Sequence, residues 1–558
     1  MWFITSPKVK TMIKLKYLAP ALIAAASLTG CNLDEEYYSE VTPDTFYTSQ
    51  ETVYSMLRNP FRHWHYLYNQ RVYWFLQEVT TDEMVCPARA SDFYDNGDWM
   101  HLHYHTWTAE HGKVKNAFNQ INYIVSHALV SIEGLSGVDY VKLGLTEQDK
   151  ADHLNQLNVL RAYAQMRTLD LFGGLPIYYS SNDMPKARNT RRENYDFIES
   201  TIKNALPNLH KRESLSEYQD GYITRGAAAM LLAQLYLNAE PFIGEDHYAE
   251  AEEVLQDLYD GVYGVYQLDP TWYGPHNFTN EQSPEAIWYI PSETGKEEFK
   301  GCNTRFYPYN AKNYFDNSKL GKCYNGYNLA PSLEKPGVPY TTKMGRPFAK
   351  YHEKDLRKKP YLYKGDGQYE GMFLMGKQKN PVTGKTVKGT KLQNGKVQDL
   401  VDYINITGNK SDMTAGDENS GIRLVKMPVP NEKDVLLTFN PDFPVLRFTE
   451  VVFNLAECKW RRGDKEGAAE LINSVRKRNF ENGNDPDPVT KDNLDLYRLA
   501  DEYMLEFMGE AHRRTDLVRW NLFTTESWWD KEPTPSTKNV FYIPNEAIYA
   551  NPLLKQND

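Results

Sequence analysis

Three blocks of the sequence repeat their apolar residues with the period of an α-helix, and this pattern limits the chain to a mainly helical fold. In residues 153–172 the apolar side chains recur at i, i+3 and i+7, and Gly173 and Gly174 predict the end of that helix. Residues 224–239 are rich in Ala and Leu, and residues 447–479 form the third block. We therefore expect a mainly α fold whose core is built from these blocks.

The helical blocks are expected to associate as pairs. Residues 447–479 break at Gly463 and Asp464, where Gly suits the end of one helix and Asp the start of the next. Ala468 follows Gly463 by five residues, and this spacing resembles the turn of a tetratricopeptide repeat. Residues 224–239 with 247–259, and 112–129 with 153–171, fit the same arrangement. Because the strict repeat signature is absent, a generic helical bundle is the alternative to a tetratricopeptide-like scaffold of helical pairs.

Between about Gly301 and Phe443 the helical periods disappear, and Gly, Asn, Pro, Lys and Tyr dominate. Turn signals such as Pro381-Val382-Thr383-Gly384 separate short strand-like pieces. The whole chain carries 40 Tyr, 23 Phe and 11 Trp, more rings than a core requires, and half-polar rings suit wet recognition surfaces. We predict a large irregular insertion with short β-strands over residues 301–443 and expect function to reside on it.

Residues 1–30 are predicted to be a lipoprotein signal peptide. Four lysines precede an apolar run over residues 17–28, which is too short to span a hydrocarbon core of ~30 Å. The run ends in Leu28-Thr29-Gly30-Cys31, which resembles the bacterial lipobox. Cys31 is therefore the expected lipidation site and residues 31–49 the tether, the alternative being an ordinary signal peptide with a chance Cys. No other segment approaches 18 consecutive apolar residues, so we expect a protein anchored to a membrane without spanning it.

The charge balance argues against a nucleic-acid partner. The chain has 63 Lys and Arg against 74 Asp and Glu, a formal net charge of −11, whereas a protein that binds phosphate backbones needs a basic surface. A basic run in the insertion argues in the other direction, for an anionic ligand; it consists of Lys343, Arg346, Lys350, Lys354, Arg357, Lys358 and Lys359. These signals conflict, so the charge of the ligand stays open.

Enzyme signatures are missing from the sequence. It contains no G-x-S-x-G elbow, no phosphate-binding loop, no H-E-x-x-H and no dinucleotide fingerprint. One block is dense in charge and contains Glu510, Arg513, Arg514, Asp516 and Arg519. Their spacing predicts structural ion pairs at i+3 or i+4 along a helix in preference to acid-base catalysis. We predict no catalytic residue and no cofactor.

Four motifs follow one another along the chain. They are Leu160-Arg161-Ala162 leading to Phe172-Gly173-Gly174-Leu175-Pro176, the alanine-rich stretch from Thr224 to Ala229, Arg447-Phe448-Thr449-Glu450 with Asn454-Leu455-Ala456-Glu457, and the stretch from Glu506 to Trp520. In this order they resemble the SusD/RagB family of outer-membrane nutrient-binding lipoproteins, over nearly the whole chain. Thr449 and Ala511 depart from the family, in which Ala and Gly are usual at these positions.

The resemblance implies a SusD-like domain over residues 50–558, with helical scaffold at 50–300 and 444–558 and the insertion between them. It also implies a lipoprotein of the cell outer membrane that faces the exterior. Such a protein would bind oligosaccharides or polysaccharides and deliver them to a TonB-dependent transporter of the SusC type. Peptide cargo, as the RagB side of the family implies, is the first alternative. An envelope glycoside hydrolase and a scaffold that binds only proteins are the others.

The segment from Arg89 to Trp99 is the first candidate for ligand contact. Sugars present apolar C–H faces and many hydroxyls, so binding needs rings and planar polar groups. The segment supplies Arg89, Asp92, Tyr94, Asn96 and Trp99. Core packing is the alternative for Trp99, because Trp is highly buried on average. A second candidate cluster follows Cys302 and consists of Arg305, Tyr307 and Tyr309.

Two segments hold metal-ligand residue types, but neither predicts a metal site. His101, His103 and His105 alternate and would face one side of a strand, yet no Cys or carboxylate completes a shell, so a half-buried polar strand is favoured. Residues 92–98 are acidic but lack the register and terminal Glu of a calcium loop. Separately, the spacing of Cys302 and Cys323 allows a disulfide in an envelope protein.

Overall fold

The computed structural model describes residues 47–69, 72–301, 303–404, 411–414 and 416–557. The predicted signal peptide, Cys31, residues 32–46 of the tether and Cys302 lie outside the described residues. Contacts between residues divide the chain after Thr48, and the unit from Ser49 to Asp558 holds every element named below. Within the described ranges, no helix combines the length and the apolar character that crossing a bilayer requires.

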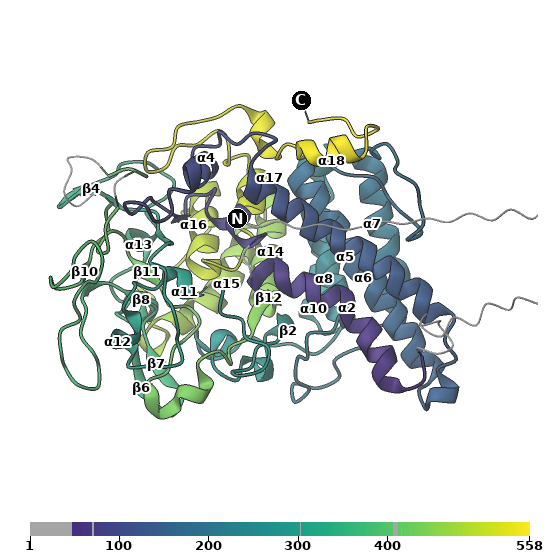
Figure 1. Cartoon of the computed structure of the whole chain (residues 1–558), viewed down its shortest axis with the longest axis horizontal. Coiled ribbons are helices and arrows are strands. Elements are labelled where there is room, and N and C mark those ends of the chain that lie inside the picture. The colour runs from purple at the N-terminus through teal and green to yellow at the C-terminus, as the bar shows by residue number, and fades with distance from the viewer. Residues whose placement is uncertain (1–46, 70–71, 302, 405–410, 415, 558) are drawn as a thin grey trace, which may run out of the picture. The chain divides into compact units, whose positions relative to one another are not determined.

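Helices form most of this unit outside the insertion, and the long helices that precede the insertion lie together on the right of Figure 1. Before the insertion they are α2 (Gln50–Asn69), α3 (Trp74–Glu78), α5 (Gly112–Ser136), α6 (Glu147–Phe172), α7 (Arg191–Ala205), α8 (Arg225–Leu237), α9 (Ala239–Ile243) and α10 (Tyr248–Tyr259). After it come α14 (Phe448–Arg461), α15 (Lys465–Arg476), α16 (Leu496–Phe507), α17 (Arg513–Arg519) and α18 (Asn545–Ala550). The contacts of α5 with α6, α8 with α10 and α14 with α15 reproduce the expected pairs, so the mainly α fold built from helical pairs is confirmed.

Local sequence signals set the helix ends. Thr146 and Asp149 form a capping box at the start of α6, in which each side chain bonds the other residue's backbone N–H. Thr224 begins α8 by accepting a hydrogen bond from a backbone N–H in the first turn. At the end of α6, Gly173 adopts a left-handed φ of 73° and donates its N–H to the carbonyl of Leu169.

The substitution Gly174→Ala is expected to lower the free energy of unfolding by about 1–3 kcal/mol. Gly174 has a φ of 95°, and an added Cβ would lie 2.9 Å from Nδ2 of Asn194. Gly112→Ala is the matched control, because its added Cβ would meet nothing within 4 Å. Urea denaturation of both variants measures the difference, and equal stabilities would contradict a sterically restricted turn at this position.

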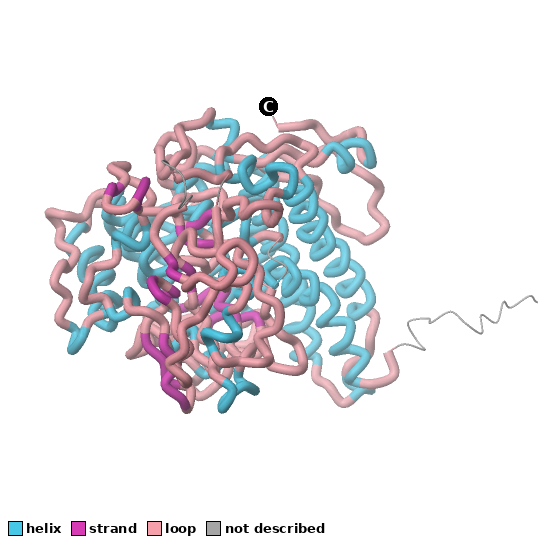
Figure 2. The backbone as a smooth tube through the Cα atoms, turned by 60° about the vertical axis from the view of Figure 1, so that its left-hand side comes forward, coloured by secondary structure: helices cyan, strands magenta, loops and turns pink. Residues whose placement is uncertain are grey.

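The strands of the described chain are short and pair as two-stranded antiparallel sheets. In the largest pair, β2 (Ala286–Ile290) lies against β12 (Phe443–Arg447), which brings the two ends of the insertion together. The others are β1 (Met84–Val85), β3 (Asn328–Leu329), β4 (Leu333–Lys335), β5 (Val338–Pro339), β6 (Leu362–Gly365), β7 (Gln368–Glu370), β8 (Phe373–Leu374), β9 (Gly376–Lys377), β10 (Asp399–Leu400) and β11 (Arg423–Leu424). Short helices α4 (Asp98–His103), α11 (Asn303–Phe306), α12 (Ala311–Phe315) and α13 (Pro347–Lys350) accompany them. Figure 2 shows that loops dominate the part of the molecule that contains these short strands. The irregular insertion with short strands is therefore confirmed.

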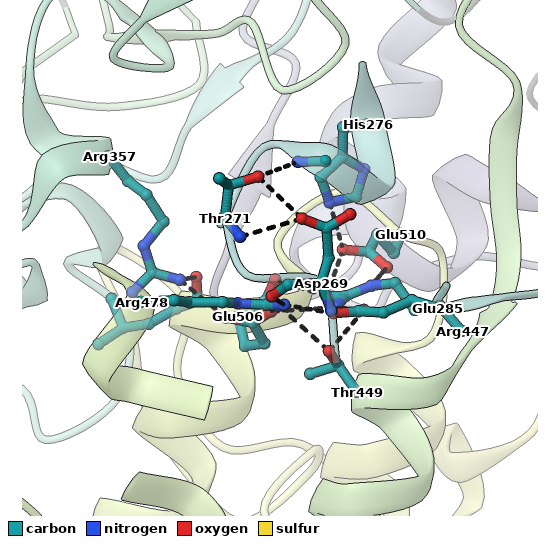
Figure 3. A network of polar contacts seen from close by, with 12 residues as sticks. Asp269, Thr271, His276, Glu285, Arg357, Arg447, Thr449, Arg478, Glu506 and Glu510 are labelled. Carbon is teal, nitrogen blue, oxygen red and sulfur yellow. Dashed lines mark hydrogen bonds and ion pairs between the residues drawn. The ribbon is translucent and has the colours of Figure 1, made fainter. Parts of the chain in front are cut away.

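Buried ion pairs join the scaffold to the insertion (Figure 3). Arg447, at the end of β12, meets Glu510 at 2.7 Å and Glu506 at 3.0 Å. Arg357 of the insertion also meets Glu506 at 3.0 Å. Burial opposes the ionisation of Glu506, but neighbouring guanidinium groups, that of Arg478 first, lower its pKa to about 2. These carboxylates are therefore ionised parts of a fixed network.

The prediction that the charged block pairs along one helix is wrong for most of its members. The chain turns between α16 and α17, where Ala511 has a left-handed φ of 71°, so the helical register is broken. The side chains instead reach across the chain, with Arg513 at 2.8 Å from Asp82, Arg514 at 3.0 Å from Asp170 and Glu510 beside Arg447. Asp516 and Arg519 do pair within α17, at 2.8 Å.

Candidate functional site

The structure brings the two predicted ligand clusters together. The hydroxyl of Tyr309 donates to the carboxylate of Asp92 at 2.5 Å, across 217 residues of sequence. Nζ of Lys391 lies 2.5 Å from the same carboxylate and 4.4 Å from the centre of the Tyr309 ring. We call the surface formed by residues 90–97, 305–309, 322–326 and Lys391 the loop site. Helices α4 and α11, which flank it in sequence, lie on the loop-rich side of Figure 1, and the first turn of α5 reaches Asp98 of α4 through Lys113 at 3.1 Å.

The first loop of the site is held in an unusual backbone conformation. Ala90, Phe93, Asp95 and Asn96 have φ values of 54°, 61°, 42° and 55°. Non-glycine residues rarely adopt such values, and they persist only where the surroundings impose them, which is common at ligand-binding sites. The described loop therefore has the backbone character of a functional segment.

Arg89 anchors the start of this loop through hydrogen bonds of its buried guanidinium. Its side chain is 1% exposed, and its guanidinium donates to Oδ1 of Asn328 at 2.7 Å and to the carbonyl of Ser420 at 3.1 Å. Burial lowers the pKa of Arg89 to about 10. A side chain enclosed in this way positions the loop, and its predicted contact with a ligand remains a prediction.

Trp99 and Tyr307 are also buried, at 4% and 1% exposure. The indole N–H of Trp99 donates to Asp95 at 2.8 Å, and its ring packs edge-on against Phe75 and Tyr327. Trp99 therefore packs in the core, which is the alternative that the sequence analysis left open for it. Ligand stacking by this ring stays untested, and it has little open face on which to occur.

The accessible rings of the loop site are contributed by other residues. Tyr94 is 53% exposed, whereas Phe93, Tyr309 and Tyr324 are half-buried. The guanidinium of Arg305 lies 4.5 Å from the ring centre of Tyr324 and 5.9 Å from that of Phe93. Asn96 is exposed beside them. Aromatic faces with polar groups between them can hold the apolar side of a sugar ring and its hydroxyls.

Four residues of the loop site were missed by the sequence analysis: Phe93, Lys322, Tyr324 and Lys391. Phe93 lies inside the predicted segment, and its aromatic character was the available signal. Lys322 and Tyr324 flank Cys323 and reach the site because residues 324–327 hydrogen-bond to residues 304–307. Nothing in the sequence near Lys391 indicates its contact with Asp92.

The histidine segment is helical, so the expectation of a strand is wrong. His101 and His103 belong to α4, and His105 follows the helix with a φ of 54°. His103 bonds Asp530 at 2.7 Å and His105 bonds the carbonyl of Thr80 at 2.9 Å, so the rings serve separate structural contacts. Over the described ranges, no group of three or more His, Cys, Asp or Glu is placed to hold a metal ion.

The remaining expectations concern cysteine and the basic run. Cys323 carries a free, buried thiol, and its suggested partner Cys302 lies outside the described residues. Three of the seven members of the basic run form ion pairs in the fold: Lys350 bonds Asp501, Arg357 lies 2.8 Å from Asp355 and Lys358 lies 2.6 Å from Glu353. These three members are therefore not free to bind an anion, whereas Lys343, Lys354 and Lys359 of the run are exposed.

Known proteins resemble this chain in sequence and in fold. Residues 284–558 match the model of the SusD family. Starch-binding protein SusD from Bacteroides thetaiotaomicron is 23% identical over 439 residues, 74% of each chain, and SusD-like protein P25 from Formosa agariphila is 20% identical over 94% of each chain. Surface glycan-binding protein A from Bacteroides thetaiotaomicron, in complex with laminarihexaose, shares the fold with a TM-score of 0.63 and 16% identity, covering 91% of this chain and all of that one. Residues 284–558 therefore belong to the SusD family, and the chain as a whole shares the fold of solved SusD-like proteins.

Proposed function

We propose that this protein is a surface glycan-binding lipoprotein that captures oligosaccharides at the loop site. The observation that carries the proposal is the hydrogen bond from Tyr309 to Asp92, which brings together two segments rich in rings and polar groups. Relatives of the chain support it, since one is named a starch-binding protein and a structure of the same fold holds laminarihexaose.

Binding at the loop site would involve no bond cleavage. The exposed face of Tyr94 and the half-buried ring of Tyr309 offer stacking surfaces for the C–H faces of a sugar. Asn96 and Arg305 offer donors at the edge of the same surface. A lipid at Cys31 would hold the protein at the outer membrane, facing the exterior, and the captured oligosaccharide would pass to a TonB-dependent transporter of the SusC type.

The variants Tyr94→Ala and Tyr309→Ala are expected to weaken glycan binding by about tenfold each, because each removes one stacking face. Electrophoresis of the purified protein through native gels that contain neutral or acidic polysaccharides measures the affinity by retardation. Tyr549→Ala is the control, because Tyr549 is 77% exposed on α18, outside the loop site.

Other outcomes would identify another function. Retardation by no polysaccharide, together with binding of peptides, would favour peptide uptake. Release of reducing ends by the pure protein would favour a glycoside hydrolase. If the wild type and the Tyr94 and Tyr309 variants were retarded equally, glycan binding would have to be assigned to another part of the chain.

A further inference from the structure

Arg305 holds an unpaired charge at the loop site. Its guanidinium lies over the rings of Tyr324 and Phe93 and forms no ion pair or side-chain hydrogen bond with any described residue. Its Nε is enclosed and has no hydrogen-bond partner in the described chain. A guanidinium offers five N–H donors in a planar fork, so this side chain retains its capacity to bind an anion.

The carboxylates around the loop site are compensated. Asp92 is paired with Lys391 at 2.5 Å and accepts the hydroxyl of Tyr309. Asp95 accepts the indole N–H of Trp99 and lies 3.3 Å from Nζ of Lys113. The carboxylates nearest the surface are thus already engaged, whereas the Arg305 guanidinium is open to a ligand.

The backbone holds Arg305 in place before any ligand arrives. Its carbonyl accepts hydrogen bonds from the N–H groups of Gly326 at 2.7 Å and Tyr327 at 3.0 Å. Glycine is needed at position 326, since an added Cβ would lie 2.5 Å from the ring of Phe93. Because the side chain already lies over the ring of Tyr324, binding through it costs little rotamer entropy.

Further positive charge lies behind the loop and on its surface, with the carboxylates of Asp417 and Glu418 near the buried arginines. Arg89 and Arg423 are buried behind the loop at 1% and 0% exposure, and neither forms an ion pair with a described carboxylate. Arg423 donates to Oδ1 of Asn325 at 2.8 Å, next to the glycine that contacts Phe93. On the surface, Nζ of Lys322 lies 4.9 Å from the ring centre of Tyr324. These charges favour an anion over a neutral group at Arg305.

We propose that the loop site takes an acidic glycan and that the Arg305 guanidinium binds the carboxylate of a uronic acid residue through paired N–H···O bonds. The rings of Tyr94 and Tyr309 would stack on the sugars of the same chain. This inference rests on the proposed glycan-binding function and adds the class of ligand. Planar carboxylate recognition is the interaction for which the forked guanidinium is suited.

The first test compares each acidic polysaccharide with its own neutral form. Polygalacturonate, alginate and glucuronoxylan are offered to the purified protein, each beside a sample whose carboxyl groups have been reduced to alcohols. At least one uronate should bind at least tenfold more tightly than its reduced form, and its affinity should fall as NaCl rises from about 50 to 500 mM. Starch, laminarin and a sulfated carrageenan complete the panel.

The second test couples the change in the ligand to a change in the protein. Arg305→Gln should weaken uronate binding about tenfold and should weaken binding of the reduced polysaccharide much less, because only the uronate loses a charged partner. Arg305→Lys should restore only part of the loss, because an ammonium lacks the fork. Arg62→Gln, a change of an exposed arginine on α2, should alter neither affinity.

The outcomes separate this inference from the function on which it rests. Tight binding of a neutral or only a sulfated glycan, unaffected by Arg305→Gln, would overturn the uronate assignment and leave glycan binding intact. Equal losses of affinity for the uronate and its reduced form in Arg305→Gln would show that Arg305 acts by shaping the loop, and would also overturn it. Binding of no glycan at all would remove the proposed function itself.

Discussion

The substitution Arg447→Met is expected to lower the free energy of unfolding by about 3–5 kcal/mol. Arg447 is 1% exposed and stands between Glu510, Glu506 and Glu285, at 2.7, 3.0 and 3.3 Å. A methionine fills much of the same volume but removes the positive charge. Three buried carboxylates would then face one another with less compensation, and burial of an unpaired charge is among the most costly changes in a folded protein.

Urea denaturation at neutral pH measures this loss. Arg62→Met on α2 is the matched control, since it removes an exposed guanidinium and should change stability by less than about 0.5 kcal/mol. A loss for Arg447→Met as small as that of the control would mean that the network contributes nothing to holding β12 against α16. The expected result would instead explain why the charged block of this sequence consists of structural residues.

Much of the scaffold could be predicted because its signals are local. The apolar period of residues 153–172 and the two glycines that follow need no knowledge of the remaining chain, and α6 ends where they indicate. The same holds for Gly463 and Asp464 between α14 and α15, where Asp464 caps the second helix. Helix pairs adjacent in sequence were therefore accessible to sequence reasoning.

Partners far apart in sequence were not accessible. The positions of Arg513 and Arg514 suggested ion pairs within a helix, but the left-handed turn at Ala511 redirects them to Asp82 and Asp170. Spacing along the chain carries no information about side chains several hundred residues away. The sequence thus identified residues that form structural ion pairs, but it did not identify their partners.

The candidate site shows the same limit. The sequence pointed to residues 89–99 and 305–309 separately, and only the fold shows that Tyr309 meets Asp92. Composition could not separate a ring that packs inside, such as that of Trp99, from one that faces solvent, such as that of Tyr94. The exposed fraction of a ring is set by tertiary packing, which a short motif does not specify.

Raising the pH is expected to destabilise the protein through a pair of buried carboxyls, and Glu83→Gln is expected to remove much of this effect. Glu78 and Glu83 are 0% and 1% exposed, beside an Arg513 guanidinium that is already paired with Asp82. Burial raises the pKa of Glu78 to about 7. Burial first, and then the charge of Glu78, raise the pKa of Glu83 further. The folded protein therefore keeps protons that the unfolded chain releases.

The sign of the pH dependence follows from this difference in bound protons. An unfolded glutamate loses its proton near pH 4.5, so between about pH 4.5 and 7 unfolding releases protons and stability falls as pH rises. In Glu83→Gln the new amide carries no ionisable proton and can donate a hydrogen bond to Glu78. The stability of this variant relative to the wild type should therefore rise by about 1–3 kcal/mol between pH 5 and pH 8. Urea denaturation at both pH values measures it, with the exposed Glu110→Gln as control, and a flat difference for Glu83→Gln would mean that the two carboxyls do not retain protons in the fold.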